Sequence, residues 1–180
     1  DEQYHASGIM ASSMVKNRIF FKHNDSQDLE EKLKNHTYNR VVVCIEGIYS
    51  MSGNIANKEI FSIVEKNNAL LVVDEAHSVG VIGDNLLGII DYFDIKNKDF
   101  IIKMGTLGKA VGSYGAYILA SKHIISYLEN RAKSIIYTTA PSLFDIELAR
   151  LSILHILDNK EKIKRKINTR QQIVKEALNI

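Results

Sequence analysis

The feature that most constrains the fold is a pair of short, continuous apolar runs, each ending in an acidic residue. Residues 41–45 read Val-Val-Val-Cys-Ile before Glu46, and residues 70–73 read Leu-Leu-Val-Val before Asp74. Runs of this length and β-branched content are typical of strands that are covered on both faces, as in parallel sheets. Helices supplied by the intervening sequence must then cover those faces.

Apolar runs and helical patterns alternate along the whole chain. Strands are predicted at residues 18–21, 40–46, 69–74, 100–104 and 114–120. Helices are predicted at residues 6–16, 27–35, 57–66, 122–133 and 142–157. Asp25 or Ser26 can cap the second of these helices. Strands that alternate with helices indicate an α/β fold with a mostly parallel sheet flanked by helices.

The composition excludes several classes of protein. Hydrophobic residues make up 46% of the chain and charged residues 24%, as in folded soluble domains. Lysine and arginine number 23 against 21 acidic residues, and this balance gives no indication of nucleic-acid or membrane binding. The single cysteine, Cys44, cannot form an internal disulfide or a cysteine zinc site, and it fits a reducing, cytoplasmic compartment.

The last part of the chain, residues 158–180, is basic, with Ile163 and Ile167 at a helical spacing. We predict a solvated helix that leads toward a further domain. A basic amphipathic helix that binds a membrane or an acidic partner is the open alternative. The chain begins without Met, so we expect a fragment of a longer protein in which residues 1–157 form the central part of an α/β domain.

Two predicted strand ends carry side chains that could take part in chemistry. Asp74 ends one apolar run and His77 follows three residues later. The next strand leads into residues 105–112, which contain three glycines and Lys109. In open α/β sheets, ligands bind beyond the carboxyl ends of the strands, and glycines let a ligand approach the backbone closely. An acid at a strand end can simply cap a helix, and a loop lysine is usually solvated, but the two together predict a site.

A nucleotide hydrolase is an alternative, because residues 73–77 read Val-Asp-Glu-Ala-His, a string found in helicases. Such an enzyme requires the phosphate loop G-x-x-x-x-G-K-[ST]. The only Gly-Lys pair is Gly108-Lys109, which has Lys103 in place of the first glycine and Ala110 in place of the hydroxyl residue. The sequence therefore argues against a phosphate-loop enzyme.

A larger set of segments resembles the α-oxoamine synthases, pyridoxal 5′-phosphate (PLP) enzymes with the aspartate-aminotransferase fold. The matching segments occur in the order found in that family, at residues 5–7, 21–25, 46–53, 74–80, 105–112 and 136–141. The resemblance implies that the α/β part of the chain belongs to the large domain of this fold and binds PLP.

The resemblance also implies roles for individual residues. Lys109 matches the lysine that forms the Schiff base with PLP and then acts as the base at the substrate Cα. Asp74 matches the carboxylate that holds a proton on the pyridine nitrogen. His77 matches the imidazole that hydrogen-bonds the 3-hydroxyl group of the ring, and His5 matches the histidine that stacks on the ring.

Three hydroxyl residues complete the site that the resemblance implies. Ser50 matches a serine close to the cofactor, and Thr106 matches a hydroxyl near its phosphate. Thr138 or Thr139 matches a phosphate contact that the neighbouring subunit supplies, so a homodimer is implied. The remaining histidines show no metal-ligand spacing, so no metal is expected.

Within the family, the likeness is greatest to the branch that condenses L-alanine with a pimeloyl thioester of CoA or acyl carrier protein during biotin synthesis. Residues 113–117 and 133–139 carry this likeness, whereas Ser78 is found in other branches. Those branches are 2-amino-3-ketobutyrate CoA ligase, 5-aminolevulinate synthase and serine palmitoyltransferase, and they stay open. A non-catalytic binding subunit is a further alternative, but such subunits typically lack the lysine that Lys109 matches.

Overall fold

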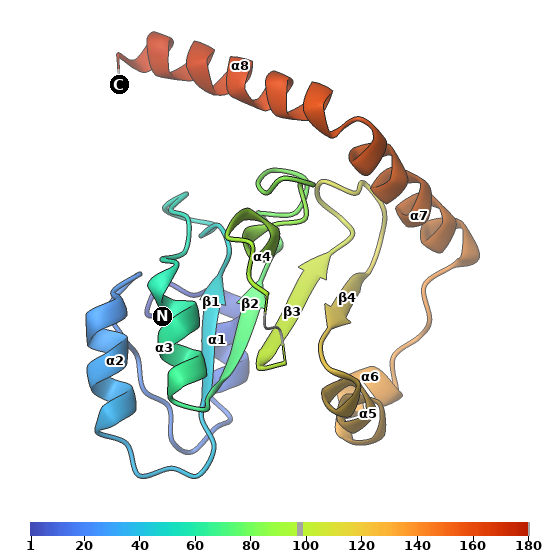
Figure 1. Ribbon diagram of the computed structural model, residues 1–180. Helices are drawn as coiled ribbons and strands as arrows, with labels where there is room; N and C mark the ends of the chain where they lie inside the picture. The colour runs from blue at the N-terminus through green and yellow to red at the C-terminus, as the bar shows by residue number, and fades with distance from the viewer. Residues whose placement is uncertain (97–98, 180) are drawn as a thin grey trace.

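The computed structural model describes residues 1–96 and 99–179. One sheet of four strands runs in the order β1 (Val42–Glu46), β2 (Leu70–Asp74), β3 (Ile101–Thr106) and β4 (Ala116–Leu119). β1 pairs with β2 and β2 with β3 in parallel, while β4 is antiparallel to β3 (Figure 1). The mostly parallel sheet predicted from the apolar runs is therefore confirmed, with an antiparallel strand at one edge.

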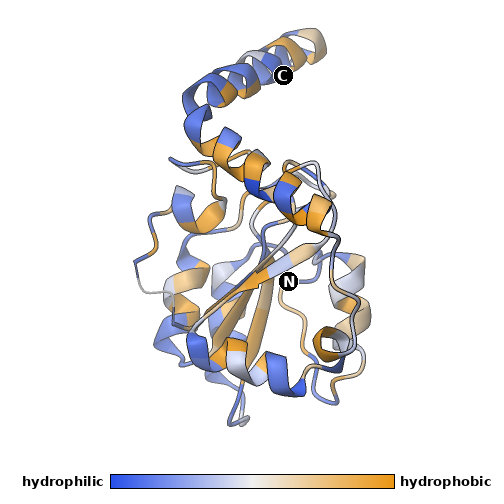
Figure 2. Ribbon diagram, turned by 90° about the vertical axis from the view of Figure 1, so that its right-hand side faces the viewer, coloured by the Kyte–Doolittle hydropathy of each residue, from blue (hydrophilic) through white to orange (hydrophobic). Residues whose placement is uncertain are grey.

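Helices lie on both faces of this sheet. α2 and α3 cover one face and α1 lies against the other (Figures 1 and 2). The helices are α1 (Ala6–Ser12), α2 (Ser26–Lys34), α3 (Glu59–Lys66), α4 (Ile89–Tyr92), α5 (Lys122–Arg131), α6 (Lys133–Ile136), α7 (Leu143–Asp158) and α8 (Lys160–Leu178). The α/β fold with helices on both faces of the sheet agrees with the prediction.

The hydrophobic core lies between the sheet and the pair α2–α3. Alternate strand residues such as Ile45, Leu71 and Val73 point to this face and are completely buried, as are Ile60 and Val64 of α3. This alternation follows from the pleat of the strands, which sends successive side chains to opposite faces. Burial of the apolar runs thus fixes the register of the strands. The register in turn fixes where each of the loops after the strands begins.

The start of α2 follows the capping rule. Asp25 is the N-cap, and its Oδ1 accepts hydrogen bonds from the N–H groups of Gln27 at 3.0 Å and Asp28 at 2.9 Å. These bonds satisfy two of the backbone donors that a helix leaves open at its first turn. Of the two predicted caps, Asp25 is the one that the structure uses.

The predicted strand at residues 18–21 is wrong. These residues are extended but belong to no sheet, because among the described residues no strand lies beside them. The backbone bond from the N–H of Glu2 to the carbonyl of Phe21, at 3.0 Å, is the one bond of this kind that they receive. A β-propensity pattern becomes a strand only where a neighbouring backbone supplies the ladder of hydrogen bonds.

The C-terminal third of the chain is built differently. α7 and α8 leave the sheet, and α8 extends away from the rest of the fold (Figure 1). Among its described residues α8 has no buried side chain, in agreement with a solvated helix. Ile180 lies outside the described residues, and the division of the protein at residues 157 and 158 stays a prediction.

Candidate active site

The carboxyl ends of three parallel strands meet at one edge of the sheet. In the strand register, Glu46 lies opposite Asp74, and Asp74 lies opposite Met104. β3 ends at Thr106 at the same edge. The loops that carry most of the predicted site residues therefore start from neighbouring positions, which is where open α/β sheets bind ligands.

The structure brings Lys109 and His77 into contact. Lys109 lies in the loop after β3 and His77 in the loop after β2, and 2.8 Å separates Lys109 Nζ from His77 Nε2. A protonated lysine can only donate hydrogen bonds, so the imidazole ring accepts at Nε2. Lys109 is exposed and His77 is half-buried. The amine is therefore held in place at the sheet edge and still reachable from solvent.

Asp74 is the last residue of β2 and is buried, with 7% of its surface exposed. Its Oδ1 accepts a hydrogen bond of 2.9 Å from the N–H of Ala76, which turns the backbone into the loop that carries His77. A buried carboxylate makes strong hydrogen bonds to a charged donor, because little water competes. Asp74 can thus hold a cationic nitrogen of a ligand.

The loop after β3 is fixed by its own hydrogen bonds. Thr106 Oγ1 accepts from the N–H of Gly108 at 3.1 Å and donates to the carbonyl of Gly115 at 3.4 Å. The carbonyl of Lys109 accepts from the N–H of Gly112, whose φ of +67° favours glycine. The hydroxyl of Thr106 is therefore used within its own loop, and its predicted phosphate contact stays a prediction.

Ser50 is placed by a residue that sequence reasoning missed. The N–H of Ser50 donates to Oε2 of Glu46 at 2.8 Å, so the strand-end acid holds the loop after β1. Glu46 is only 2% exposed. Its position at the end of an apolar run, directly comparable to that of Asp74, is the signal that could have found it.

His5 lies at the start of α1, where it acts as the N-cap. Its Nδ1 lies 2.8 Å from Ser7 Oγ, and its side chain is exposed. The adjacent Tyr4 is partly buried, and burial together with the charges of Cys44, Asp74 and Glu46 raises the pKa of its hydroxyl. Tyr4 is therefore within electrostatic reach of the acidic strand ends. Among the described residues, no hydrogen bond joins His5 to Lys109, His77 or Asp74.

Thr138 is not part of this group within one chain. It follows α6, which lies at the opposite end of the sheet from the carboxyl ends of β1, β2 and β3 (Figure 1). Its side chain is exposed. The prediction assigned this residue to the site of a neighbouring subunit, and it stays a prediction.

A third buried acid, Glu75, stabilises the loop after β2. Its Oε2 accepts from the Ser78 hydroxyl and, at 2.8 Å, from the N–H of Ile89 at the start of α4. Its Oε1 lies 3.7 Å from Lys103 Nζ. A side chain at Gly88 would collide with this carboxylate, and the φ of +95° at Gly88 also favours glycine. Glu75 thereby fixes the loop that follows Asp74.

Tyr117 on β4 is the ladder partner of Gly105 on β3, and its ring and hydroxyl lie against that glycine. Burial, followed by the charges of Glu75 and Asp74, raises the pKa of Tyr117 to about 12. The phenol therefore stays protonated at neutral pH and can donate a hydrogen bond near the acidic edge.

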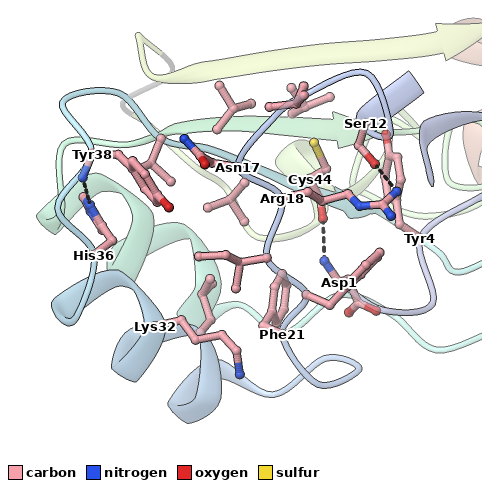
Figure 3. A pocket seen from close by; sticks show the side chains of 18 of the residues that line it. Asp1, Tyr4, Ser12, Asn17, Arg18, Phe21, Lys32, His36, Tyr38 and Cys44 are labelled. Carbon is pink, nitrogen blue, oxygen red and sulfur yellow. Dashed lines mark hydrogen bonds between the residues drawn. The ribbon is translucent and has the colours of Figure 1, made fainter. Parts of the chain in front are cut away.

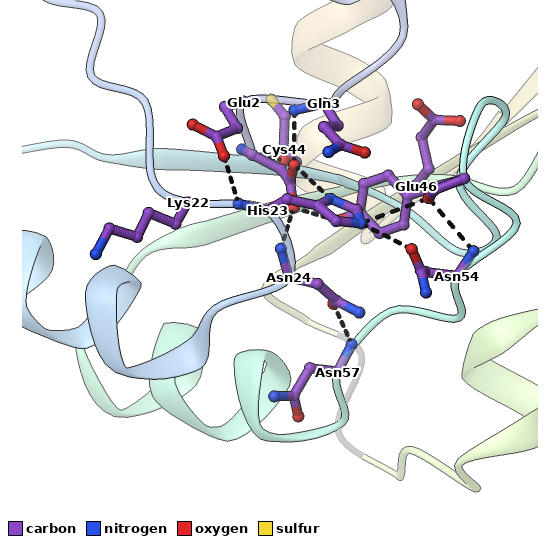
Figure 4. A network of polar contacts seen from close by, with 12 residues as sticks. Glu2, Gln3, Lys22, His23, Asn24, Cys44, Glu46, Asn54 and Asn57 are labelled. Carbon is purple, nitrogen blue, oxygen red and sulfur yellow. Dashed lines mark hydrogen bonds and ion pairs between the residues drawn. The ribbon is translucent and has the colours of Figure 1, made fainter.

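A polar network ties the start of the chain to the loop after β1 (Figure 4). His23 contacts Asp1 through Nδ1 and Asn54 through Nε2, both at 3.1 Å. The Tyr49 hydroxyl donates to Asp1 Oδ2 at 2.7 Å. Because Tyr49 and Asn54 belong to the loop that carries Ser50, the network also helps to fix this loop.

A cavity of about 960 Å³ opens on the α1 side of the sheet (Figure 3). Residues 17–21 line it on one side, and Val42 and Cys44 of β1 line it on the other. None of the predicted site residues lines it. The cavity is apolar space at the open edge of β1 and is separate from the site at the strand ends.

Within residues 1–96 and 99–179, no three side chains of His, Cys, Asp or Glu come together as metal ligands would. No helix in the same residues combines the length and the hydropathy that a membrane crossing needs.

Comparison with known proteins places the chain in a family. The aminotransferase class I and II family matches residues 4–179. The 8-amino-7-oxononanoate synthase of Helicobacter pylori (strain ATCC 700392 / 26695) is 47% identical over 100% of this chain and 49% of its own length. This chain thus spans about half the length of the curated relatives that it matches.

Solved structures with a similar fold include members of the same family. A lysine-to-alanine variant of serine palmitoyltransferase from S. paucimobilis, with a bound PLP–myriocin aldimine, is 28% identical. The match covers 91% of this chain and 43% of the other, with a TM-score of 0.80. The 8-amino-7-oxononanoate synthase of Francisella tularensis is 28% identical over 100% of this chain and 53% of its own, with a TM-score of 0.75. The chain belongs to the class I and II aminotransferase family, and within it to the α-oxoamine synthases.

Proposed function

We propose that this chain is the cofactor-binding part of a PLP-dependent acyltransferase. The enzyme would condense L-alanine with pimeloyl-CoA or pimeloyl acyl carrier protein, giving 8-amino-7-oxononanoate, CO₂ and the free thiol, a step of biotin synthesis. The observation that carries this proposal is the 2.8 Å contact between Lys109 and His77 at the strand edge where Asp74 ends β2. The identity of 47% to a relative named 8-amino-7-oxononanoate synthase supports the choice of substrates.

The residues at this edge fit PLP. An aldehyde needs an amine that solvent can reach, and Lys109 is exposed. A pyridine nitrogen that stays protonated needs a buried acid, and Asp74 is 7% exposed. PLP, when bound, supplies an electron sink that makes the bonds at the Cα of an amino acid labile.

The chain's own residues would bind, orient and move protons. Lys109, held by His77, would take the proton from the alanine Cα and return one after CO₂ has left. Asp74 would hold the proton on the ring nitrogen, and His77 would also reach the 3-hydroxyl group. His5, Ser50 and Thr106 would line the ring and the phosphate.

Assembly and location are part of the same proposal. Thr138 follows α6, which lies at the opposite end of the sheet from the carboxyl ends of the parallel strands (Figure 1), and its predicted phosphate contact is one that a neighbouring subunit supplies. We therefore propose a homodimer that works in the cytoplasm on small-molecule substrates.

The first experiment tests the cofactor in the full-length protein. Purified protein mixed with PLP is expected to gain a visible absorption band, and borohydride reduction followed by peptide mapping should place the label on Lys109. Lys109→Ala should lose both the band and the label, whereas Lys122→Ala, at an exposed lysine of α5, should keep them. A label on another lysine would refute the assignment.

A second experiment tests the substrates. L-alanine with pimeloyl-CoA should release CO₂ and free thiol faster than glycine or L-serine with the same thioester. A preference for glycine, or for L-serine with a long-chain acyl-CoA, would move the assignment to another branch of the family. ATP hydrolysis without any PLP band would revive the nucleotide-hydrolase alternative. A non-catalytic subunit would bind no PLP through Lys109.

A further inference from the structure

One buried oxygen at the strand edge lacks a partner. Glu46 is 2% exposed, and its Oε2 accepts the N–H of Ser50 at 2.8 Å. Its Oε1 is buried, and no donor among the described residues reaches it. Buried polar atoms of folded proteins are almost always hydrogen-bonded, so an orphaned carboxylate oxygen calls for an explanation.

Glu75, which is also buried near this edge, shows the contrast. Glu75 has a donor or a cation at each oxygen, from Ser78, Ile89 and Lys103. Both carboxylate oxygens of Glu75 are therefore paired inside the fold. In Glu46 only Oε2 is paired, through its bond to Ser50, and Oε1 has no partner among the described residues.

The strand register fixes where that charge acts. Glu46 lies directly opposite Asp74 in the parallel ladder, so the two Cα atoms are about 4.8 Å apart and their side chains leave the same face of the sheet. Tyr4 is within electrostatic reach of both carboxylates. The acid that would face the ring nitrogen of PLP thus has a second acid beside it.

We propose that Glu46 is a positioning residue of the cofactor site: its charge, beside that of Asp74, favours the protonated cofactor, and its bond to Ser50 fixes the loop at the ring. This inference rests on the proposed function. It adds a residue that neither contacts the reacting atoms nor was matched to a role by the family resemblance. The effect of the Glu46 charge and the effect of its hydrogen bond to Ser50 can be tested separately, because different substitutions remove them.

The experiment uses the full-length protein loaded with PLP and follows the cofactor absorption band as a function of pH. Glu46→Gln keeps an oxygen for the Ser50 N–H but removes the charge. Losing a negative charge near the cofactor disfavours its protonated form, so the midpoint of the spectral change should fall by about 0.5–1 pH unit. Glu46→Asp keeps the charge but shortens the reach, so it should leave the midpoint near that of the parent protein and raise the dissociation constant of PLP about tenfold.

Glu129→Gln, at an exposed glutamate of α5, is the matched control and should change neither quantity. A parent protein with no PLP band would overturn the proposed function, and this inference with it. A normal band with an unmoved midpoint in Glu46→Gln would overturn the role of Glu46 alone. If Glu46→Gln fails to fold, a midpoint in Glu46→Asp equal to that of the parent, with weaker PLP binding, supports the role, and unchanged PLP binding overturns it.

Discussion

Two regions of the chain, which we call the packed half (residues 21–106) and the outer half (residues 120–179), differ in how many side chains they bury. Between Phe21 and Ile101, apolar side chains of the strands and of α2 and α3 form one buried cluster. Beyond β4, the described residues of α5, α6 and α8 bury no side chain, and α7 buries only Ala149 and Ile156. Large apolar side chains such as Leu143, at 85% exposure, and Phe144, at 74%, lie open on α7.

This difference indicates that the packed half holds the loops of the candidate site in place. The loops with Ser50 and His77 follow strands of the packed half, and Lys109 follows the last strand that packs against it. The contacts of the outer half within this chain are too few to fix a site. Exposed apolar surface on this scale usually marks a region that packs against something else.

The largest effect should come from Glu75, whose carboxylate joins the packed half to the loop after β2. Glu75→Ala leaves the Ile89 N–H without its acceptor and removes the carboxylate that lies 3.7 Å from Lys103 Nζ. Removing one member of a buried ion pair costs about 4 kcal/mol of unfolding free energy. Urea unfolding of both proteins measures the loss, and a loss under about 1 kcal/mol would show that this network is not what orders the edge.

A matched pair of truncations tests the comparison directly. Leu71→Ala removes a completely buried side chain and should lower the unfolding free energy by about 3 kcal/mol. Leu143→Ala, at an exposed leucine of α7, should lower it by less than about 0.5 kcal/mol. Equal losses in a denaturant titration would break the comparison, and they would mean that α7 is buried in the assembled protein.

Tyr117 lies at the boundary between the halves and should make stability depend on high pH. Its pKa is raised to about 12, above its ordinary value of 10.0, so the unfolded chain loses this proton first as the pH rises. The contribution is therefore complete below pH 10 and lost as the pH approaches 12, and partial exposure limits it to about 1 kcal/mol. Tyr117→Phe should show a smaller drop in melting temperature between pH 9 and pH 11 than the parent protein.

Cys44 should show the smallest effect, one of reactivity and not of stability. Burial raises the pKa of its thiol, so less thiolate is present at any pH. Alkylation by iodoacetamide at pH 8 should be about tenfold slower in the native protein than in the chain unfolded in guanidinium chloride. Since Cys44 is the only cysteine, the mass of the whole protein reports this reaction. Equal rates in both states would mean that the edge of the packed half opens freely.

The sequence predicted the strands of the packed half because each is a continuous apolar run, as around Ile45 and Val73. It did not predict α4, since its first N–H groups are satisfied by Glu75, an acid distant along the chain, and local patterns carry no trace of such a bond. It placed residues 18–21 in a strand because propensity says nothing about whether a partner is present. In both places, contacts with residues distant along the chain determine the local structure.

In the candidate site, too, some features follow from the sequence and others are visible only in the structure. The approach of Lys109 to His77 follows from topology, since parallel neighbouring strands deliver their loops to one edge. The position of Glu46 at the end of an apolar run could have marked it as a candidate, but its oxygen without a donor is visible only in the coordinates.

The open flank of β1 has a consequence for handling this chain. Within residues 1–96 and 99–179, β2 is the one strand that pairs with β1, and Val42 is 53% exposed beside the apolar cavity. A terminal strand with unpaired backbone groups is a template on which strands of other molecules can assemble. Concentrated solutions of these 180 residues alone should therefore form intermolecular sheets, and a lysine in place of Val42 is the remedy that natural sheet proteins use.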